Sequence, residues 1–407
     1  MAATAPETLL RALADRPHPV LVSFAGRTIV ACDPVEVATG ADVWDALAIV
    51  CEHRSAGAAA AAGGWIGLLG YDLGATVERL PEPHPDPGGP PVALVGRYET
   101  VAILEPSGGC TLASTRSESA LDDLERLVGA ATAPASATPG HHAASPSLDA
   151  GAYRAAVARA RELIAAGDCY QVNLAQRLTA PWDGGPVDFA LALWRAAGTA
   201  GHRAYVGFPD GAVVSASPER LVRVADGFAG SEPIKGTAPP GGWERLARSP
   251  KDRAEHLMIV DLVRNDLGRV ATAGGVSVPR LFDHLSTPYV EHMVSEVRAE
   301  LRPAVTATDV LRAVFPGGSV TGTPKVRAME VIRELEPVSR GPAFGSVLTV
   351  GTDGAVEASI TIRTAWVSGG EARYWCGGAV VWDSEPEAER REAWAKAEPF
   401  LRAVGAT

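Results

Sequence analysis

The sequence has few cysteines, no long apolar run and no excess of positive charge. Its five cysteines are odd in number, lie far apart and form no CxxC pair, which argues against a disulfide framework or a zinc site. The formal net charge of −11 argues against nucleic acid as a partner, because phosphate binding needs a basic surface. No apolar stretch reaches the roughly 18–20 residues of a membrane helix, and the first residues lack the pattern of a signal peptide. We therefore expect a cytoplasmic protein with reduced thiols and no membrane partner.

Composition divides the chain of 407 residues into three parts. Residues 131–149 are rich in alanine, proline, serine and threonine and contain few large apolar side chains, which indicates a linker. They separate an N-terminal region, residues 1–130, from a larger region, residues 150–407. In the larger region, strand patterns come in blocks with helical patterns between the blocks. This order predicts an α+β fold with largely antiparallel sheets.

Two segments with helical spacing carry pairs of acidic residues. Asp252 and Glu255 follow a Ser249-Pro250 helix start, and Glu389 and Glu392 have the same three-residue offset near the C-terminus. Residues three apart share a helix face, so the two pairs are together able to hold a hard divalent cation such as Mg²⁺. Spacing alone favours the alternative of solvated helix faces with Glu–Lys pairs.

The stretch FPGGSVTGTPKV is suited to bind an anion. Its glycines have the offset of a Walker A loop, but the Gly-Lys-Ser/Thr ending is missing, which argues against a nucleotide P-loop. Thr323 and Pro324 predict a helix start, where free N–H groups after Gly322 and the charge of Lys325 suit a carboxylate or a phosphate. A purely structural glycine-rich turn is an equal alternative.

A second group of residues offers acid, amine and guanidinium chemistry. Glu219 follows a strand and a Ser-Pro turn, and Lys235 lies in the stretch SEPIKGTAPP. A lysine acts as a nucleophile only where its surroundings favour the neutral amine; otherwise Lys235 is an exposed cation at a strand end. His292 is a further acid/base candidate, although a lone histidine is more often only hydrogen-bonded. Arg363, in a predicted apolar strand, suits a planar carboxylate. Gly377 and Gly378 lie inside a predicted strand, where glycine often marks a close approach of the backbone to a ligand.

Taken together, these residues describe a site for a small anion with more than one carboxylate, assisted by a metal ion. As a set, the motifs resemble the chorismate-utilising enzymes, which include anthranilate synthase component I, aminodeoxychorismate synthase component I and the isochorismate and salicylate synthases. The matching segments run through residues 150–407 in the family's order: GDCYQVNLAQRL, ASPERL, PIKGT, KDRAEHLMIVDLVRNDLGRV, FPGGSVTGTPKVRAMEVIRELEP, ASITIRT and DSEPEAERREAWAK. The resemblance implies an anthranilate-synthase-like fold of two packed antiparallel sheets flanked by helices. It also implies chorismate, a dicarboxylate, as the ligand, together with Mg²⁺.

The resemblance further implies roles for single residues. Glu255, Glu389 and Glu392, with Asp252 nearby, would hold the Mg²⁺ that in turn holds the ring carboxylate. Glu219 would be the general acid that helps the C4 hydroxyl leave, and Arg363 would pair with the enolpyruvyl carboxylate. The residues implied at the metal-bound end are Gly322, Thr323, Gly377, Gly378 and Lys396. The remaining assignments are Gln171 and Lys325 for substrate binding, and Thr237 and His292 for catalysis beside Lys235.

Two positions divide the subfamilies. The isochorismate and salicylate synthases carry a lysine base where this chain has Gln171, so its absence argues for ammonia rather than water as the nucleophile. Anthranilate synthases typically have Pro-Ile-Ala-Gly-Thr where residues 233–237 are Pro-Ile-Lys-Gly-Thr. The lysine form resembles aminodeoxychorismate synthase, in which the amine attacks C2 of chorismate with loss of the C4 hydroxyl, and ammonia then adds at C4 and expels the lysine.

The resemblance also bears on partners and alternatives. None of the five cysteines lies in a Gly-x-Cys-Leu-Gly glutaminase element, so a separate glutamine amidotransferase subunit is implied as the source of ammonia. The Leu-Leu-Glu-Ser element of tryptophan feedback sites is missing, which weakens the alternative of an anthranilate synthase component I. A non-catalytic relative that only binds a partner is a further alternative.

Overall fold

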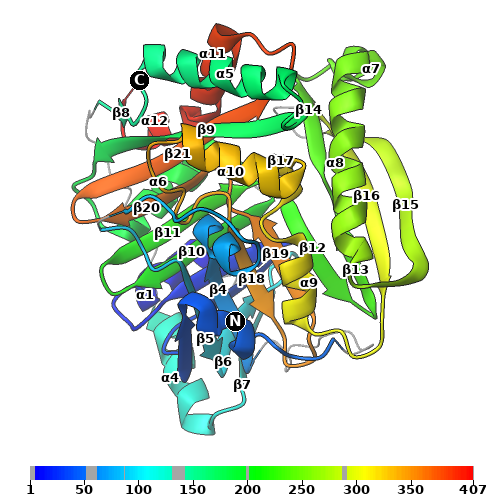
Figure 1. Ribbon diagram of the computed structural model, residues 1–407. Helices are drawn as coiled ribbons and strands as arrows, with labels where there is room; N and C mark the ends of the chain where they lie inside the picture. Colours follow the sequence, from blue (N-terminus) through cyan, green and yellow to red (C-terminus); the bar gives the residue numbers. More distant parts are fainter. Residues whose placement is uncertain are drawn as a thin grey trace.

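Two large antiparallel sheets form the body of the molecule in the computed structural model (Figure 1). The structure describes residues 5–51, 62–86, 88–130, 143–198, 201–286 and 291–406. Strand pairs in the described part are antiparallel, and helices flank the sheets, so the predicted fold class is confirmed. No helix in these residues is long and apolar enough to cross a membrane.

The first sheet has the strand order β17-β9-β21-β20-β11-β10-β1-β2-β6-β7, with β8 beside β9. Its strands are β1 (Val20–Phe24), β2 (Arg27–Ala31), β6 (Thr100–Leu104), β7 (Cys110–Ser114), β8 (Ser145–Pro146), β9 (Gln171–Pro181), β10 (His202–Phe208), β11 (Gly211–Ser217), β17 (Gly322–Thr323), β20 (Thr364–Ser368) and β21 (Glu371–Val380). The second sheet has the order β14-β16-β13-β12-β19-β18-β4-β5-β3, with β15 beside β16. Its strands are β3 (Glu36–Thr39), β4 (Gly64–Leu69), β5 (Ala93–Tyr98), β12 (Arg220–Ala225), β13 (Phe228–Ser231), β14 (Ile234–Ala238), β15 (Ala271–Ser286), β16 (Glu291–Leu301), β18 (Ser346–Val350) and β19 (Val356–Ile360).

The helices of the described part lie around and between the ends of these sheets (Figure 1). They are α1 (Pro6–Leu13), α2 (Val43–Ala46), α4 (Glu118–Ala130), α5 (Ala150–Ala165), α6 (Pro186–Ala197), α7 (Trp243–Arg248), α8 (Pro250–Gly268), α9 (Ala307–Val314), α10 (Lys325–Leu335), α11 (Pro386–Lys396) and α12 (Glu398–Ala403). Short 3-10 turns are η1 (Gly40–Asp42), η2 (Tyr71–Thr76) and η3 (Gly318–Val320).

Helix α8 packs against the end of the second sheet and positions several site residues. From Val294 to Leu301, buried and more exposed residues of β16 alternate, as expected when one face of a strand covers a core. Ile259 and Val263 of α8 join the same core cluster as Val297 of β16. The Oγ of Ser249 accepts a hydrogen bond from the Asp252 N–H at 3.3 Å, so the predicted helix cap is confirmed.

Strands from both sides of the predicted 131–149 linker share the two sheets. Strand β1 pairs with β10 in the first sheet, and β4 pairs with β18 in the second. Residues 131–142 of the predicted linker lie outside the described residues. After them, β8 pairs with β9, and Asp149 caps α5 by accepting from the Ala152 N–H at 2.8 Å.

Two of the places where the chain crosses between the sheets are neighbours. Glu219 lies in the connection from β11 to β12, and Arg363 lies in the connection from β19 to β20. The Ile360 N–H donates to the Glu219 carbonyl at 3.0 Å, and the Ala216 N–H donates to the Arg363 carbonyl at 3.1 Å. The prediction of Arg363 inside a strand is therefore wrong: its φ of +51° belongs to a bend that redirects the chain.

The start of α10 differs from the prediction as well. The N-cap is Pro324, whose backbone is extended with φ −64° and ψ 140°, and the helix begins at Lys325. Thr323 belongs instead to β17, where it pairs with Gln171 of β9. The predicted threonine cap is wrong because the helix starts one residue later, and the Thr323 hydroxyl accepts no hydrogen bond from the described residues.

Candidate active site

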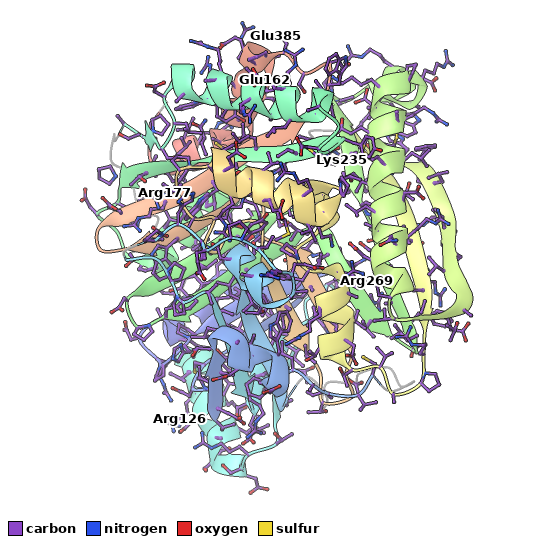
Figure 2. All side chains as sticks on the ribbon, viewed as in Figure 1. Arg126, Glu162, Arg177, Lys235, Arg269 and Glu385 are labelled. Atoms are coloured by element: carbon purple, nitrogen blue, oxygen red, sulfur yellow. The ribbon has the colours of Figure 1, made fainter. Side chains whose placement is uncertain are left out.

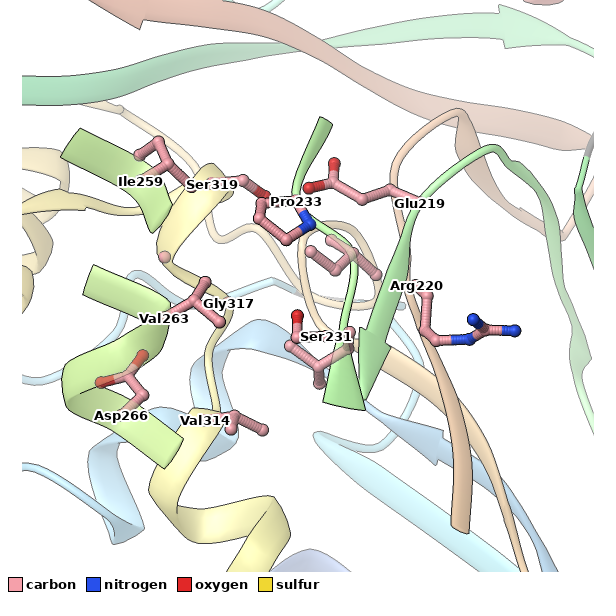
Figure 3. A pocket seen from close by; sticks show the side chains of 13 residues that line it. Glu219, Arg220, Ser231, Pro233, Ile259, Val263, Asp266, Val314, Gly317 and Ser319 are labelled. Carbon is pink, nitrogen blue, oxygen red and sulfur yellow. The ribbon is translucent and has the colours of Figure 1, made fainter. Parts of the chain in front are cut away.

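Glu219 is buried at the crossing between the two sheets. Burial raises the pKa of its carboxyl group, and the positive charge of Lys235 is the largest influence in the opposite direction. The side chain points toward Ser319 beside a cavity of about 20 Å³, which has room for one water molecule (Figure 3). A carboxyl group with a raised pKa keeps its proton to higher pH, which suits a general acid.

Lys235, labelled in Figure 2, lies at an irregularity in β14, the terminal strand of the second sheet. The register with β16 shifts between Lys235 and Thr237, and Gly236 between them has a φ of +72°. The Lys235 Nζ lies 3.9 Å from the Glu255 Oε1 and donates to the Ser319 carbonyl at 3.4 Å. Only 15% of its side chain is exposed, so the amine is held inside the protein rather than at a solvated strand end.

Two histidines lie near this amine. The Nδ1 of His292 is 3.4 Å from the Gly236 carbonyl oxygen, and burial lowers the pKa of His292. His256, which the sequence did not single out, is fully buried with its Nε2 2.7 Å from the Ser295 Oγ. Burial first and the charge of Lys235 second lower the pKa of His256 to about 4. Its position directly after Glu255 is the signal that sequence reasoning missed. The side chain of Thr237 is outside the described part.

The acidic pair of α11 converges over Gly378 of β21. A β-carbon on Gly378 would lie 3.4 Å from the Glu389 Oε2, 3.5 Å from the Lys396 Nζ and 3.6 Å from the Glu392 Oε1. Lys396, 2.8 Å from Glu392, lowers the pKa of that carboxyl group, whereas burial raises the pKa of Glu389. Ser384, which the sequence analysis did not assign, donates to the Glu389 Oε1 at 2.7 Å. We call Glu389, Glu392 and Lys396 the α11 cluster.

The four predicted metal ligands do not meet as one group. Within the described ranges, no three acidic, histidine or cysteine side chains lie close enough together to hold a metal ion. Glu255 pairs with Lys235, and Asp252 is half-buried in the first turn of α8. Glu389 and Glu392 do lie together, and Mg²⁺ is commonly held by one or two carboxylates with waters and ligand oxygens. Two carboxylates that face the same space are therefore compatible with a Mg²⁺ site of this kind.

Gln171 and Thr323 form a second polar surface at the paired ends of β9 and β17. The two residues are opposite each other in the strand pair, so their side chains project on the same side. Gln171 is fully buried, and neither its amide atoms nor the Thr323 hydroxyl has a hydrogen-bond partner in the described residues. Because buried polar groups are normally paired, these atoms are available for a ligand.

Lys325 does not join these groups. Its Nζ lies 2.6 Å from the Asp266 Oδ2, and the two side chains are 7% and 3% exposed. Burial lowers the pKa of Lys325, and Asp266 is the main influence that opposes this change. The ammonium group thus forms a buried ion pair that links α10 to α8. The sequence could not show this pair because the two residues are distant in the chain.

The predicted glycines and Arg363 have different surroundings. A β-carbon would lie 2.1 Å from the Gln171 carbonyl oxygen at Gly322 and 2.2 Å from the Leu174 carbonyl oxygen at Gly377, so both glycines permit close strand pairing. Arg363 is outside the ion pairs of the described residues, and burial first and the charge of Arg363 second lower the pKa of His292. Its guanidinium group is therefore near His292 and available for a carboxylate.

Known proteins match the chain over most of its length. A model of the chorismate binding enzyme family matches residues 7–402. Aminodeoxychorismate synthase component 1 of Klebsiella aerogenes is 42% identical over 354 residues, covering 83% of this chain and 76% of the relative. Anthranilate synthase component 1 of Pseudomonas putida is 37% identical over 371 residues, covering 84% and 75%. The crystal structure of anthranilate synthase component I from Streptococcus pneumoniae superposes with a TM-score of 0.82 at 29% identity, covering 92% of each chain.

Proposed function

Because the chain belongs to the chorismate-binding enzyme family, we propose that it acts as an aminodeoxychorismate synthase component I. It would convert chorismate and ammonia into 4-amino-4-deoxychorismate and water. The observation that carries the proposal is the position of Lys235: an amine held inside the protein, beside Glu255 and close enough to Glu219 to influence its pKa. Relatives with this name are 40–42% identical to the chain.

The first step uses Lys235 as nucleophile and Glu219 as acid. The lysine amine forms a bond to C2 of chorismate, the ring double bonds shift, and the bond from C4 to its hydroxyl breaks. Glu219 gives its proton to the hydroxyl, which leaves as water. The buried position of Glu219 supports this role because burial raises the pKa of its carboxyl group.

The second step reverses the shift of the ring double bonds. Ammonia forms a bond to C4, the double bonds return, and the bond from C2 to Lys235 breaks, which restores the amine. The proton that the incoming nitrogen loses replaces the one given by Glu219, so the acid is ready for another turnover. Gln171 and Thr323, whose buried polar atoms lack partners among the described residues, are placed to hold the uncharged nucleophile or the substrate.

Substrate carboxylates would be bound at two positions. The Arg363 guanidinium group, near His292, would pair with the enolpyruvyl carboxylate. At the α11 cluster, Glu389 and Glu392 would hold Mg²⁺, which when bound neutralises the ring carboxylate, and Lys396 adds a further positive charge. Glu255 and Asp252 would support this end from α8.

The ammonia would come from a separate glutamine amidotransferase subunit. The relatives at 40–42% identity are named as a component 1, which supports the presence of a second component for them. Added ammonium ions would replace this subunit in an assay of the chain alone.

A second candidate is an anthranilate synthase component I. Relatives with that name are 37–39% identical to this chain, and a solved structure of that kind has a TM-score of 0.82. The two activities differ in product, since the anthranilate reaction also releases pyruvate. Lys235 favours the first candidate because a nucleophilic amine has a role only when the substituent at C4 is replaced.

The test is to incubate the purified chain with chorismate, Mg²⁺ and ammonium ions and to identify the product by mass spectrometry and fluorescence. We expect 4-amino-4-deoxychorismate from the native chain and none from Lys235→Met. Lys251→Met is the matched control, because Lys251 is 56% exposed and pairs with Asp383 at the surface. Direct release of fluorescent anthranilate would favour the second candidate, and no loss of chorismate at all would favour a non-catalytic relative.

A further inference from the structure

The Lys235 ammonium is held by the turn between α9 and α10. Its polar contacts in the described residues are the Ser319 carbonyl oxygen at 3.4 Å and the Glu255 Oε1 at 3.9 Å. Ser319 lies in η3, and its side chain also lies next to the Glu219 carboxyl group (Figure 3). The conformation of this short turn therefore determines the position of the Lys235 amine relative to Glu219, the proposed general acid.

Arg340 holds the very next carbonyl group of the same turn. Its Nη1 donates to the Val320 carbonyl at 2.7 Å, and its Nη2 donates to the Asn173 carbonyl at 2.6 Å. Asn173 in turn donates its N–H to the Thr321 carbonyl at 2.8 Å. Successive carbonyl groups at residues 319, 320 and 321 are thus fixed by Lys235, Arg340 and β9.

The guanidinium group of Arg340 is itself fixed on every side. Glu336 accepts from its Nε at 2.8 Å and from its Nη2 at 2.6 Å, and the two side chains are 5% and 2% exposed. The rings of Tyr71 and Phe344 lie on it at 4.5 and 4.6 Å. The Glu336 Oε1 also accepts from the Ala175 N–H at 2.8 Å, which ties the pair to β9. A planar guanidinium group with paired donors orients the groups that it binds, which the single ammonium group of a lysine cannot do.

We propose that Arg340, locked by Glu336, Tyr71 and Phe344, is a positioning residue for Lys235. It fixes the Val320 carbonyl, and through the adjoining peptide it keeps the Ser319 carbonyl aimed at the amine. The inference deepens the proposed function, since it assumes that the placement of Lys235 limits turnover. Arg340 is almost fully buried, and its hydrogen bonds in the described residues go to Glu336 and to the Val320 and Asn173 carbonyl groups, so its effect passes through the backbone of η3.

The experiment compares Arg340→Lys with Arg333→Lys as a matched control. Arg333 lies on α10, is 10% exposed on its side chain and pairs with Asp72 at 2.9 Å, but it has no hydrogen bond to the turn at 317–321 in the described part. We measure kcat and KM for chorismate, together with the acetylation of Lys235 relative to Lys251 by a trace of acetic anhydride without substrate. Peptide mass spectrometry gives the labelling ratio, and thermal unfolding monitors the fold.

In Arg340→Lys we expect kcat to fall about 100-fold, because small misplacements of a reacting group have effects of that order. KM is expected to change little, and the Lys235 labelling ratio is expected to rise severalfold as the amine leaves the Ser319 carbonyl. Arg333→Lys is expected to keep native kcat and labelling even if it lowers thermal stability. Equal kcat and equal labelling in the two variants would overturn the proposal.

Phe344→Leu provides a second variant if Arg340→Lys does not fold. It removes one ring from the guanidinium group while leaving every hydrogen bond possible, so a smaller change of kcat and labelling in the same direction is expected. Native values of both quantities in Phe344→Leu, with Arg340→Lys unfolded, would also overturn the proposal. The labelling reaction contains no chorismate, so the labelling ratio does not depend on which product the enzyme forms. A different product together with an altered labelling ratio would refute only the proposed function.

Discussion

Replacing Gly378 with alanine tests the α11 cluster without disturbing the sheet. The new methyl group would lie 3.4, 3.5 and 3.6 Å from Glu389, Lys396 and Glu392, which are ordinary contact distances. The fold should therefore tolerate it, with a smaller loss of the free energy of unfolding than a substitution that clashes with the backbone would cause. The methyl group would nevertheless fill the space that the three charged groups face.

The adjacent glycine is the matched control. At Gly377, a β-carbon would lie only 2.2 Å from the Leu174 carbonyl oxygen and 2.6 Å from the Ala175 Cα, so β9 and β21 would have to separate. Overpacking of this kind costs about 1–3 kcal/mol or more. We therefore predict different effects of the two neighbouring substitutions: Gly377→Ala should lower stability, and Gly378→Ala should lower activity.

The assay combines urea unfolding with Mg²⁺-dependent consumption of chorismate. We expect kcat/KM of Gly378→Ala to fall by about 100-fold, which corresponds to about 2.7 kcal/mol of transition-state stabilisation. The Mg²⁺ concentration for half-maximal activity should rise as well. Native kcat/KM with native Mg²⁺ dependence in Gly378→Ala would refute the assignment of this cluster to the metal and the ring carboxylate. Equal destabilisation of the two variants would refute the packing argument.

Two further predictions concern buried charges. Burial raises the pKa of Glu219 above its ordinary value of 4.5, so the native protein should lose stability as pH rises from 4.5 through the raised pKa. Glu219→Gln cannot ionise, so at pH 8 it should unfold at a higher urea concentration than the native chain, whereas at pH 4 it should not. It should also lose activity. Parallel curves of stability against pH for the two proteins would contradict this account. Lys325→Met should leave Asp266 charged and unpaired and lower the free energy of unfolding by about 3–5 kcal/mol, and Asp266→Asn added to Lys325→Met should restore most of it. Urea denaturation of both variants checks this, and an unaltered midpoint for Lys325→Met would show that the pair is not buried as described.

Local patterns in the sequence located most of the helices that carry the site. Ser249-Pro250 was identified as a helix start because a cap needs only a side chain and an N–H three residues later. The offset of Glu389 and Glu392 placed both carboxylates on one helix face for the same reason. Thr323 failed as a cap, since α10 begins only after Pro324 and the Thr323 hydroxyl bonds none of the described residues.

The sequence by itself determined the fold class, the family and the residue types of the site, because helix periodicity, strand alternation and motif order are properties of neighbouring residues. Only the tertiary structure decided that Glu219 and Arg363 occupy two adjoining crossings between the sheets. It also decided that Lys325 belongs to a buried pair with Asp266, and that Arg340 reaches the turn that holds Lys235. These contacts join residues far apart in the chain, and their geometry follows from how two sheets and their helices pack, which no local pattern records.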